Sequence, residues 1–323
     1  MIKKIALVLV CVAGFAACSQ TPKDTETYSS GFISMAVDES FAPIFESQIM
    51  VFEATYPDAN INMIDTTEMA AINMLVNDSL RLAVVTRGLR DSEKAKLKEK
   101  QLFARETMIA LDAVALIINP QNTDSLMSIS SFRKILNGEI TQWKELNPAS
   151  KLGKINVVFD NPQSSTVRFA LDSVLRAPKI NATVYAQDNN AEVIDYVSRN
   201  PSALGVIGVN WIGHQTDTIE NKSTISFDDR VRVVAMSNYA DATPDNSFKP
   251  FQAYIVGFED EDGERQKYPM TRTVYMISTD PKMGLPTGFV NFVASDRGQR
   301  IILKSGLVPA IVNQIRLINL KEE

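Results

Sequence analysis

The sequence predicts an α/β protein with two units, each a mainly parallel sheet flanked by helices. Two observations support this prediction. Short apolar runs alternate with amphipathic helical runs, which is the pattern of parallel strands joined by right-handed helical crossovers. The chain also has 323 residues, which is enough for roughly two domains of about 150 residues each.

The first unit is predicted to begin with a strand at 32–37, followed by a helix that opens at Ser40. This helix has apolar side chains at spacings of four and three residues, namely Phe45, Ile49 and Phe52. Asp65 and Glu68 have the spacing of a capping box, so we expect a second helix to begin there. The other elements expected in this unit are strands 61–64 and 82–85 and a lysine-rich helix after Asp91.

The second unit is predicted to begin with the continuous apolar run 113–118, which is typical of a buried strand. After a polar break at 119–122 we expect helix 129–137, strand 155–159, helix 165–176, strand 183–186, helix 190–199 and strand 204–209. Residues 235–269 are polar and are expected to be irregular. A strand at 274–277 and a helix at 287–305 complete the predicted fold.

The first 17 residues have the layout of a secretory signal, with two lysines before the apolar run 5–17. That run is shorter than the about 20 residues that a membrane-spanning helix needs. Ala16 and Ala17 precede Cys18, which resembles the processing site of a bacterial lipoprotein; a plain signal peptide cut nearby is the alternative. We therefore expect an exported, lipid-anchored protein with residues 18–31 as a flexible tether.

Composition narrows the classes of function. Hydrophobic residues make up 45% of the chain and charged residues 22%, as in an ordinary soluble domain. The formal net charge of −5 argues against a nucleic-acid partner held by bulk charge. It does not exclude an anionic ligand, because local backbone dipoles bind anions even on an acidic protein. With Cys18 as the only cysteine after processing, we expect no disulfide and no cysteine metal site.

Three predicted strand-to-helix turns place hydroxyl side chains near helix starts, at 38–41, 65–68 and 164–166. Any one of them is explained by N-capping, since Ser and Thr are preferred there. In open α/β sheets, however, ligands bind beyond the carboxyl ends of the strands, where all three turns lie. Together they are suited to binding a tetrahedral oxyanion.

Two arginines lie near these turns. Arg87 ends the third strand of the first unit and could hold an oxyanion with two parallel hydrogen bonds. A surface arginine paired with a carboxylate is the alternative. Arg168 has Asp172 four residues later, so we expect it to form an ion pair on the helix surface.

Enzyme classes find little support in the sequence. His214 is the only histidine, which argues against histidine-based triads and histidine-rich zinc sites. Ser164 lies in no G-x-S-x-G elbow, and the glycine-rich nucleotide-binding motifs are absent. The acidic run 259–262 lacks the alternating oxygen spacing of a calcium loop and is expected to be a solvated loop.

Six segments, in the family's order, resemble the phosphate-binding PstS family of ABC-transporter lipoproteins. The first, Ser40-Phe41-Ala42-Pro43, looks like the family's first anion-binding turn. The others are LAVVTRGLRDSE (82–93), ALDAVALIINPQN (110–122), SFRKILNGEITQWKELNP (131–148), ALGVIGVNW (203–211) and FVNFVASDRGQRIILKSGLVPA (289–310).

The resemblance implies a two-lobed periplasmic-binding-protein fold of type II that closes on an anion. Lobe 1 would comprise residues 32–112 and 253–323, and lobe 2 residues 113–252. The implied phosphate contacts are Ser40, Phe41 through its backbone N–H, Thr66, Thr67, Arg87, Ser164, Ser165 and Thr166. No cofactor or metal is implied.

Two positions depart from the family's pattern. Ser165 stands where the family's Ser-Gly-Thr has glycine. Arg87 stands where other members have an aspartate, and Asp160 where they have its arginine partner. We therefore expect an ion pair between Arg87 and Asp160 across the cleft, with charges exchanged. Asp160, or less strongly Asp38, is the candidate acceptor for the proton that hydrogen phosphate carries and sulfate lacks.

The leading functional hypothesis is binding of inorganic phosphate and delivery to an ABC transporter permease by a monomeric protein. The alternatives are binding of another oxyanion such as sulfate or molybdate, and a lipid-anchored sensor or adhesion protein without a transport role. A phosphate-ester hydrolase is the weakest alternative, because catalytic bases and metal ligands are missing from the sequence.

Overall fold

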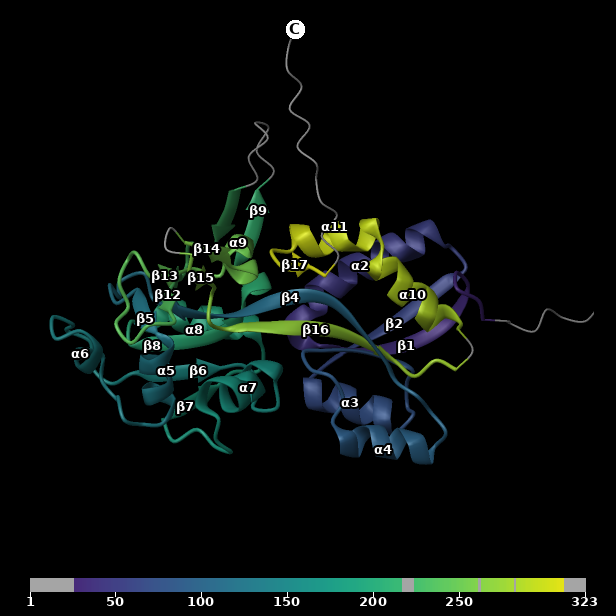
Figure 1. The fold of residues 1–323 in the computed structure, drawn as a ribbon, viewed down its shortest axis with the longest axis horizontal. Coiled ribbons are helices and arrows are strands. Elements are labelled where there is room, and N and C mark those ends of the chain that lie inside the picture. Colours follow the sequence, from purple (N-terminus) through teal and green to yellow (C-terminus); the bar gives the residue numbers. More distant parts are fainter. Residues whose placement is uncertain (1–25, 217–223, 261–262, 282, 311–323) are drawn as a thin grey trace, which may run out of the picture.

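The computed structural model describes residues 26–216, 224–260, 263–281 and 283–310 (Figure 1). Its centre is a ten-stranded mixed sheet with the principal order β2-β1-β3-β16-β4-β8-β6-β7. The predicted signal segment and Cys18 lie outside the described residues. Residues 26–31 of the predicted tether, however, belong to the folded part, because Glu26 pairs with Arg81 and Gly31 begins β1.

One end of the sheet, here called the β1 side, has three parallel strands: β1 (Gly31–Asp38), β2 (Ala59–Thr66) and β3 (Leu82–Val85). Figure 1 shows α2, α10 and α11 on one face of this end and α3 and α4 on the other. Successive side chains of β1 point to opposite faces of the sheet. Met35 and Val37 therefore pack in the core cluster that contains Phe45, whereas Ala36 packs in the cluster that contains Leu75.

Helices of the β1 side follow the predicted order, with two differences. The helices are α2 (Ala42–Thr55), α3 (Glu68–Val76), α4 (Asp91–Glu99), α10 (Leu285–Ala294) and α11 (Asp296–Lys304). Asp65 does not cap α3, because β2 continues to Thr66 and Thr67 is the N-cap. The single helix predicted at 287–305 is two helices, since the extended backbone of Ser295 separates α10 from α11.

The other end of the sheet, here called the β8 side, contains β8 (Ala203–Gly208), β6 (Asn156–Phe159) and β7 (Val184–Ala186), which run parallel. The helix predicted at 165–176 is α7 (Ser165–Phe169) continued by a π-helical turn, Ala170–Leu175. The remaining principal helices are α5 (Ile129–Leu136), α6 (Trp143–Leu146) and α8 (Asn190–Arg199).

The polar region 235–269 contains short elements within its described part. They are β12 (Ala235–Ser237), β13 (Ser247–Phe248), α9 (Gln252–Val256), β14 (Phe258–Glu259) and β15 (Arg265–Gln266). β12 pairs with β5 (Leu126–Ser128) and β13. The other short strands are β9 (Gly213–Thr216), β10 (Thr224–Phe227), β11 (Arg232–Val233) and β17 (Val308–Pro309).

Two long antiparallel strands, β4 (Arg105–Ile118) and β16 (Thr271–Ser278), lie between the two sides (Figure 1). β4 pairs with β16 as far as Ala113 and then with β8 from Val114 onward. Residues 113–118 are fully buried, which confirms the buried strand predicted there. None of the helices in the described ranges is both long enough and apolar enough to cross a membrane.

Candidate functional site

The predicted polar turns follow the carboxyl ends of three parallel strands. β1 leads through the short helix η2 (Glu39–Phe41) into α2, β2 leads into α3, and β6 leads into α7. Ser164 caps α7, because its hydroxyl accepts a hydrogen bond of 3.3 Å from the backbone N–H of Val167. The capping interpretation of Ser164 is therefore confirmed.

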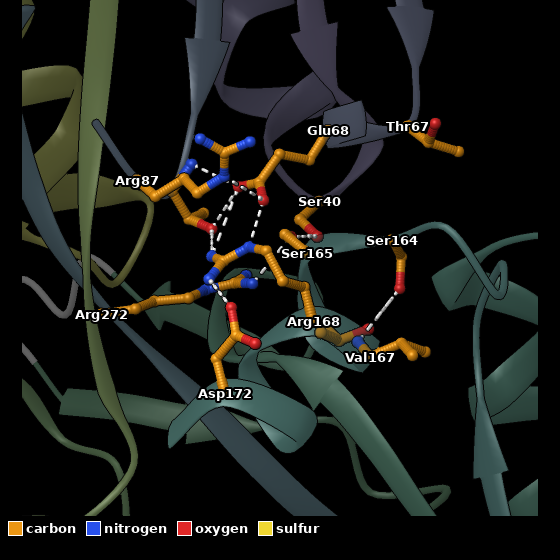
Figure 2. Close-up of polar contacts among 12 residues, drawn as sticks. Ser40, Thr67, Glu68, Arg87, Ser164, Ser165, Val167, Arg168, Asp172 and Arg272 are labelled. Carbon is orange, nitrogen blue, oxygen red and sulfur yellow. Dashed lines mark hydrogen bonds and ion pairs between the residues drawn. The ribbon is translucent and has the colours of Figure 1, made fainter. Parts of the chain in front are cut away.

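Hydroxyls of the first and third turns meet between the two sides (Figure 2). Ser40 Oγ lies 3.3 Å from Ser165 Oγ, although the residues are 125 positions apart in the chain, and both side chains are buried. Ser164 Oγ lies 2.8 Å from Thr166 Oγ1. The hydroxyl cluster, as it is called here, consists of two such pairs: Ser40 with Ser165 across the two sides, and Ser164 with Thr166 within the third turn.

Ser165 occupies an ordinary helical position. It is the first residue of α7, and it is not among the residues of the described chain that have positive φ. The turn therefore does not need the backbone conformation that favours glycine, so a serine side chain fits there.

The second turn does not join this hydroxyl cluster. Thr67 caps α3, since its hydroxyl accepts a hydrogen bond of 3.3 Å from the backbone N–H of Ala70. Figure 2 shows its side chain apart from Ser40 and Ser165. Thr66 is the last residue of β2 and is only partly buried.

A buried arginine that the sequence-based prediction omitted lies against the cluster. Arg272 of β16 donates from Nη1 to Ser165 Oγ at 2.8 Å and from Nε to Asp112 Oδ2 at 2.7 Å. Its guanidinium carbon lies 5.2 Å from the centre of the buried Phe41 ring. Burial alone would lower the pKa of Arg272, but the charges of Asp112 and Asp38 raise it, so the guanidinium stays charged.

The sequence did contain a signal for this pair. Asp112 interrupts an apolar strand, and a charge buried in a sheet requires a partner. The strand register places Arg272 directly opposite it, on β16. Asp112 therefore indicated that a buried cation was needed, whereas Arg272 stands between two threonines and was not marked by an apolar run.

The predicted ion pair between Arg87 and Asp160 is wrong. Arg87 directs both terminal nitrogens to the carboxylate of Glu93, at 2.8 and 2.7 Å. Glu93 lies in the first turn of the helix that follows Arg87, so a local carboxylate engages the guanidinium fork. Asp160 instead accepts hydrogen bonds from the hydroxyls of Ser164, at 2.5 Å, and Thr166.

A different ion pair joins the two sides of the molecule (Figure 2). Arg168 Nε is paired with Glu68 Oε1, and Arg168 Nη2 donates to Thr86 Oγ1 at 2.6 Å. Glu68 is buried and also accepts from the Thr86 backbone N–H at 2.7 Å. The predicted contact of Arg168 with Asp172 is present at 3.4 Å. Arg168 therefore ties α7 to the start of α3, which its sequence spacing did not reveal.

Two buried carboxylates near the hydroxyls use their oxygens differently. Asp160 accepts from hydroxyls at Oδ1 and from Asn190 Nδ2, at 3.2 Å, at Oδ2. Asp38 Oδ1 accepts from the Ser40 backbone N–H at 2.9 Å, whereas its buried Oδ2 has no hydrogen-bond partner among the described residues. Burial, reinforced by the charge of Glu68, raises the pKa of Asp38 to about 7. Burial also raises the pKa of Asp160.

The first turn contacts the β8 side at two further points. Glu39 accepts hydrogen bonds from the backbone N–H and the side-chain amide of Asn190, at 3.0 and 2.8 Å. The Ser40 carbonyl accepts from Asn210 Nδ2 at 2.6 Å and from Trp211 Nε1 at 3.0 Å. Burial raises the pKa of Glu39 to about 7. The two sides are thus in direct polar contact around the hydroxyl cluster.

This arrangement has the chemistry of an oxyanion site. Hydroxyl and guanidinium groups are hydrogen-bond donors, and donors to an anion make short, strong bonds. In the described ranges, no three or more His, Cys, Asp or Glu side chains are grouped so that they could hold a metal ion. The donors around Ser40 and Ser165 are thus of the kind that an anion accepts hydrogen bonds from.

A protein-family model described as a PBP superfamily domain matches residues 19–297. The chain belongs to the PBP superfamily. The chain is 28% identical to the phosphate-binding protein PstS of Staphylococcus aureus (strain USA300) over 181 residues. These residues make up 55% of this chain and 54% of that relative. The matched region therefore spans about half the length of the relative.

Solved structures with the same fold include two from phosphate transport. One, from Clostridium perfringens, is assigned as a phosphate ABC transporter substrate-binding protein and contains bound phosphate. It is 22% identical to this chain and has a TM-score of 0.68, and the match covers 87% of this chain and 100% of the Clostridium perfringens chain. An ABC-type phosphate transport receptor from Vibrio cholerae is 21% identical, covers 85% and 99%, and has a TM-score of 0.59. These likenesses establish the PBP-like fold of this chain.

Proposed function

We propose that this chain binds inorganic phosphate between two lobes and delivers it to the permease of an ABC transporter. The observation that carries the proposal is the meeting of Ser40 and Ser165, because it brings hydroxyl donors from both sides of the molecule to one buried point. Phosphate as the ligand is supported by the Staphylococcus aureus relative, a phosphate-binding protein, and by the phosphate bound in the Clostridium perfringens structure.

The proposed lobes are residues 32–112 with 253–323, and residues 113–252. The pairing of β4 supports this division, because β4 pairs with β16 up to Ala113 and with β8 from Val114 onward. A few residues in strands that connect two lobes are the usual place for a hinge. The lobes would then close on the anion by bending β4 and β16.

The proposed phosphate donors are the hydroxyls of Ser40, Ser164, Ser165 and Thr166, with the backbone N–H of Phe41. In the structure Ser164 and Thr166 donate to Asp160, so the anion would take over these two hydrogens. Thr66, Thr67 and Arg87 are proposed to lie at the edge of the site.

The anchor and the partners are part of the same proposal. A lipid on Cys18 would hold the protein at the cell-envelope face of a bacterial membrane, where a permease could receive the cargo. Binding by hydroxyls and a guanidinium needs neither a cofactor nor catalysis, and we expect the protein to act as a monomer.

Calorimetric titration of the purified protein with phosphate, sulfate and molybdate tests the function. We expect saturable binding of phosphate with one site per chain and much weaker binding of sulfate. Tight binding of sulfate or molybdate with no phosphate binding would assign another oxyanion. Absence of binding by any of these anions would contradict the proposed function.

Trp211 offers a direct signal of closure, since its Nε1 donates to the Ser40 carbonyl across the two sides at 3.0 Å. The chain contains two tryptophans, and Trp143 is fully buried on the β8 side. We expect phosphate to change tryptophan fluorescence with a saturating dose dependence. Trp211→Phe should abolish this change, whereas a change that persists in Trp211→Phe would show that the indole does not report on the cleft.

A further inference from the structure

Arg272 has more hydrogen-bonding capacity than its structural partner uses. A guanidinium carries five N–H donors in a planar fork. Asp112 receives one bond, from Nε, and Nη2 is buried without a hydrogen-bond partner among the described residues. A guanidinium serving only to neutralise Asp112 would be expected to bind it with two parallel bonds. Nη1 is directed to the serine cluster, which it contacts at Ser165, and Nη2 lies beside Gly208, where an added Cβ would be 3.4 Å away.

The bond from Arg272 to Ser165 also determines what the serine hydroxyl can do. A hydroxyl has one hydrogen to donate and two lone pairs that accept. Arg272 Nη1 donates into one lone pair at 2.8 Å, so the hydrogen of Ser165 is left for another acceptor. Ser165 Oγ also lies 3.3 Å from Ser40 Oγ, on the opposite side of the site. The hydroxyl hydrogen is therefore not used by Arg272 and can be donated to Ser40 or to an anion in the cluster.

Arg272 and Ser165 come from different parts of the fold. Arg272 is held on β16 by Asp112 of the neighbouring strand β4, and its guanidinium carbon lies over the Phe41 ring at 5.2 Å. Ser165 begins α7 on the β8 side. The bond between them therefore depends on how α7 is positioned relative to the central strands.

We infer that Arg272 is the cation of the proposed anion site and that it positions the Ser165 hydroxyl to donate to the anion. This inference rests on the proposed phosphate-binding function and adds to it the charged residue that the hydroxyl turns lack. Arg87 does not fill this role, because its terminal nitrogens are engaged by Glu93.

Titration of the purified full-length chain with inorganic phosphate tests the inference. We expect Arg272→Met to weaken binding roughly 100-fold and Ser165→Ala roughly 10-fold, because charge-assisted bonds are the stronger ones. Arg272→Lys keeps the charge but cannot hold both Asp112 and Ser165, so a loss of about 10-fold is expected. Arg81→Met is the matched control, since it also removes an arginine from a buried aspartate, Asp280, and should bind phosphate like the wild type.

A double-mutant cycle separates positioning from general damage to the fold. The variant with both Arg272→Met and Ser165→Ala should bind little more weakly than Arg272→Met alone, because Ser165 loses its orientation once Arg272 is gone. Losses that simply multiply would overturn the positioning role. A purely structural role would lower thermal stability without such coupling.

Three outcomes of the phosphate titrations decide whether the inference about Arg272 holds. Wild-type affinity in a cooperatively folded Arg272→Met would overturn the inference. If that variant fails to fold, Arg272→Lys and Ser165→Ala decide in its place, and binding within about twofold of the wild type in both would overturn it. Absence of phosphate binding by the wild type would instead sink the proposed function itself.

Discussion

Glu68→Gln is expected to lower the free energy of unfolding by about 3 kcal/mol, because breaking a buried ion pair leaves its partners uncompensated. Glu68 is 2% exposed and accepts bonds from the Thr86 N–H, the Thr86 hydroxyl and Arg168. The glutamine amide would face these donors with an N–H₂ group. Urea denaturation followed by circular dichroism measures the loss.

The same pair predicts a pH dependence. Burial alone would raise the pKa of Glu68, but Arg168 and Thr86 together lower it below the ordinary value of 4.5. The carboxylate therefore stabilises the fold above about pH 4.5, and this contribution is lost as the pH falls through the lower folded-state pKa. The difference in stability between wild type and Glu68→Gln should accordingly shrink in acid.

Asp172→Asn is the matched control, since it neutralises the other carboxylate that Arg168 contacts. Asp172 is 51% exposed at its side chain, and exposed pairs contribute little. We expect a change within about 0.5 kcal/mol. A loss of less than about 1 kcal/mol in Glu68→Gln would contradict a stabilising role for the ion pair between the two sides.

Asp38→Asn is expected to bind sulfate more tightly than the wild type does. The ratio of sulfate affinity to phosphate affinity should rise by roughly 100-fold, which is the effect of one buried mismatch between donor and acceptor. Asp38 Oδ2 is buried and lacks a hydrogen-bond partner among the described residues, whereas both oxygens of Asp160 are engaged. Hydrogen phosphate can donate its proton to Asp38 Oδ2; sulfate at neutral pH has none to donate. The asparagine amide supplies a donor instead, so the discrimination should disappear.

Protonation of Asp38 should mimic this substitution in the wild type. Burial and the charge of Glu68 raise the pKa of Asp38 to about 7, so the carboxyl gains a hydrogen as the pH falls below that value. Wild-type affinity for sulfate should therefore rise between about pH 8 and about pH 6, a range in which sulfate itself does not titrate. Asp38→Asn should show a smaller rise, because burial also raises the pKa of neighbouring Glu39 to about 7.

Asp124→Asn serves as the control for charge removal. Asp124 is also buried and, like Asp38, has an Oδ2 without a hydrogen-bond partner among the described residues, but its Oδ1 accepts from Asn147 and not from a residue of the first turn. We expect its phosphate and sulfate affinities to match those of the wild type. If Asp38→Asn still excludes sulfate at every pH, proton recognition must come from another group.

The order of strands and helices was predictable because it depends on the local period of apolar residues. The continuous apolar run 113–118 predicted a buried strand, and the apolar segment 32–37 predicted another; both form strands of the central sheet. Boundaries were weaker. Glu68 fits a capping box with Asp65 in the sequence, but the cap depends on where β2 ends, which pairing with β1 determines.

The hydroxyl turns could be found from the sequence because each follows a strand and opens a helix. The charged partners could not, because they depend on contacts between distant segments. Arg87 has a carboxylate within reach in its own turn, at Glu93, and Arg168 reaches 100 residues back to Glu68. The spacing of residues along one helix predicted Asp172 as the partner of Arg168. It could not predict Glu68, because Glu68 lies on another element that faces this helix.

The serine at position 165 has a consequence for anyone who would build a phosphate sensor from this chain. Its side chain contacts Ser40 and Arg272, so a single atom belongs both to the ligand site we propose and to the contact between the β1 side and the β8 side. Substitutions there would shift affinity and signal amplitude together. A sensor whose working range is tuned independently of its change in fluorescence must therefore be adjusted at another residue.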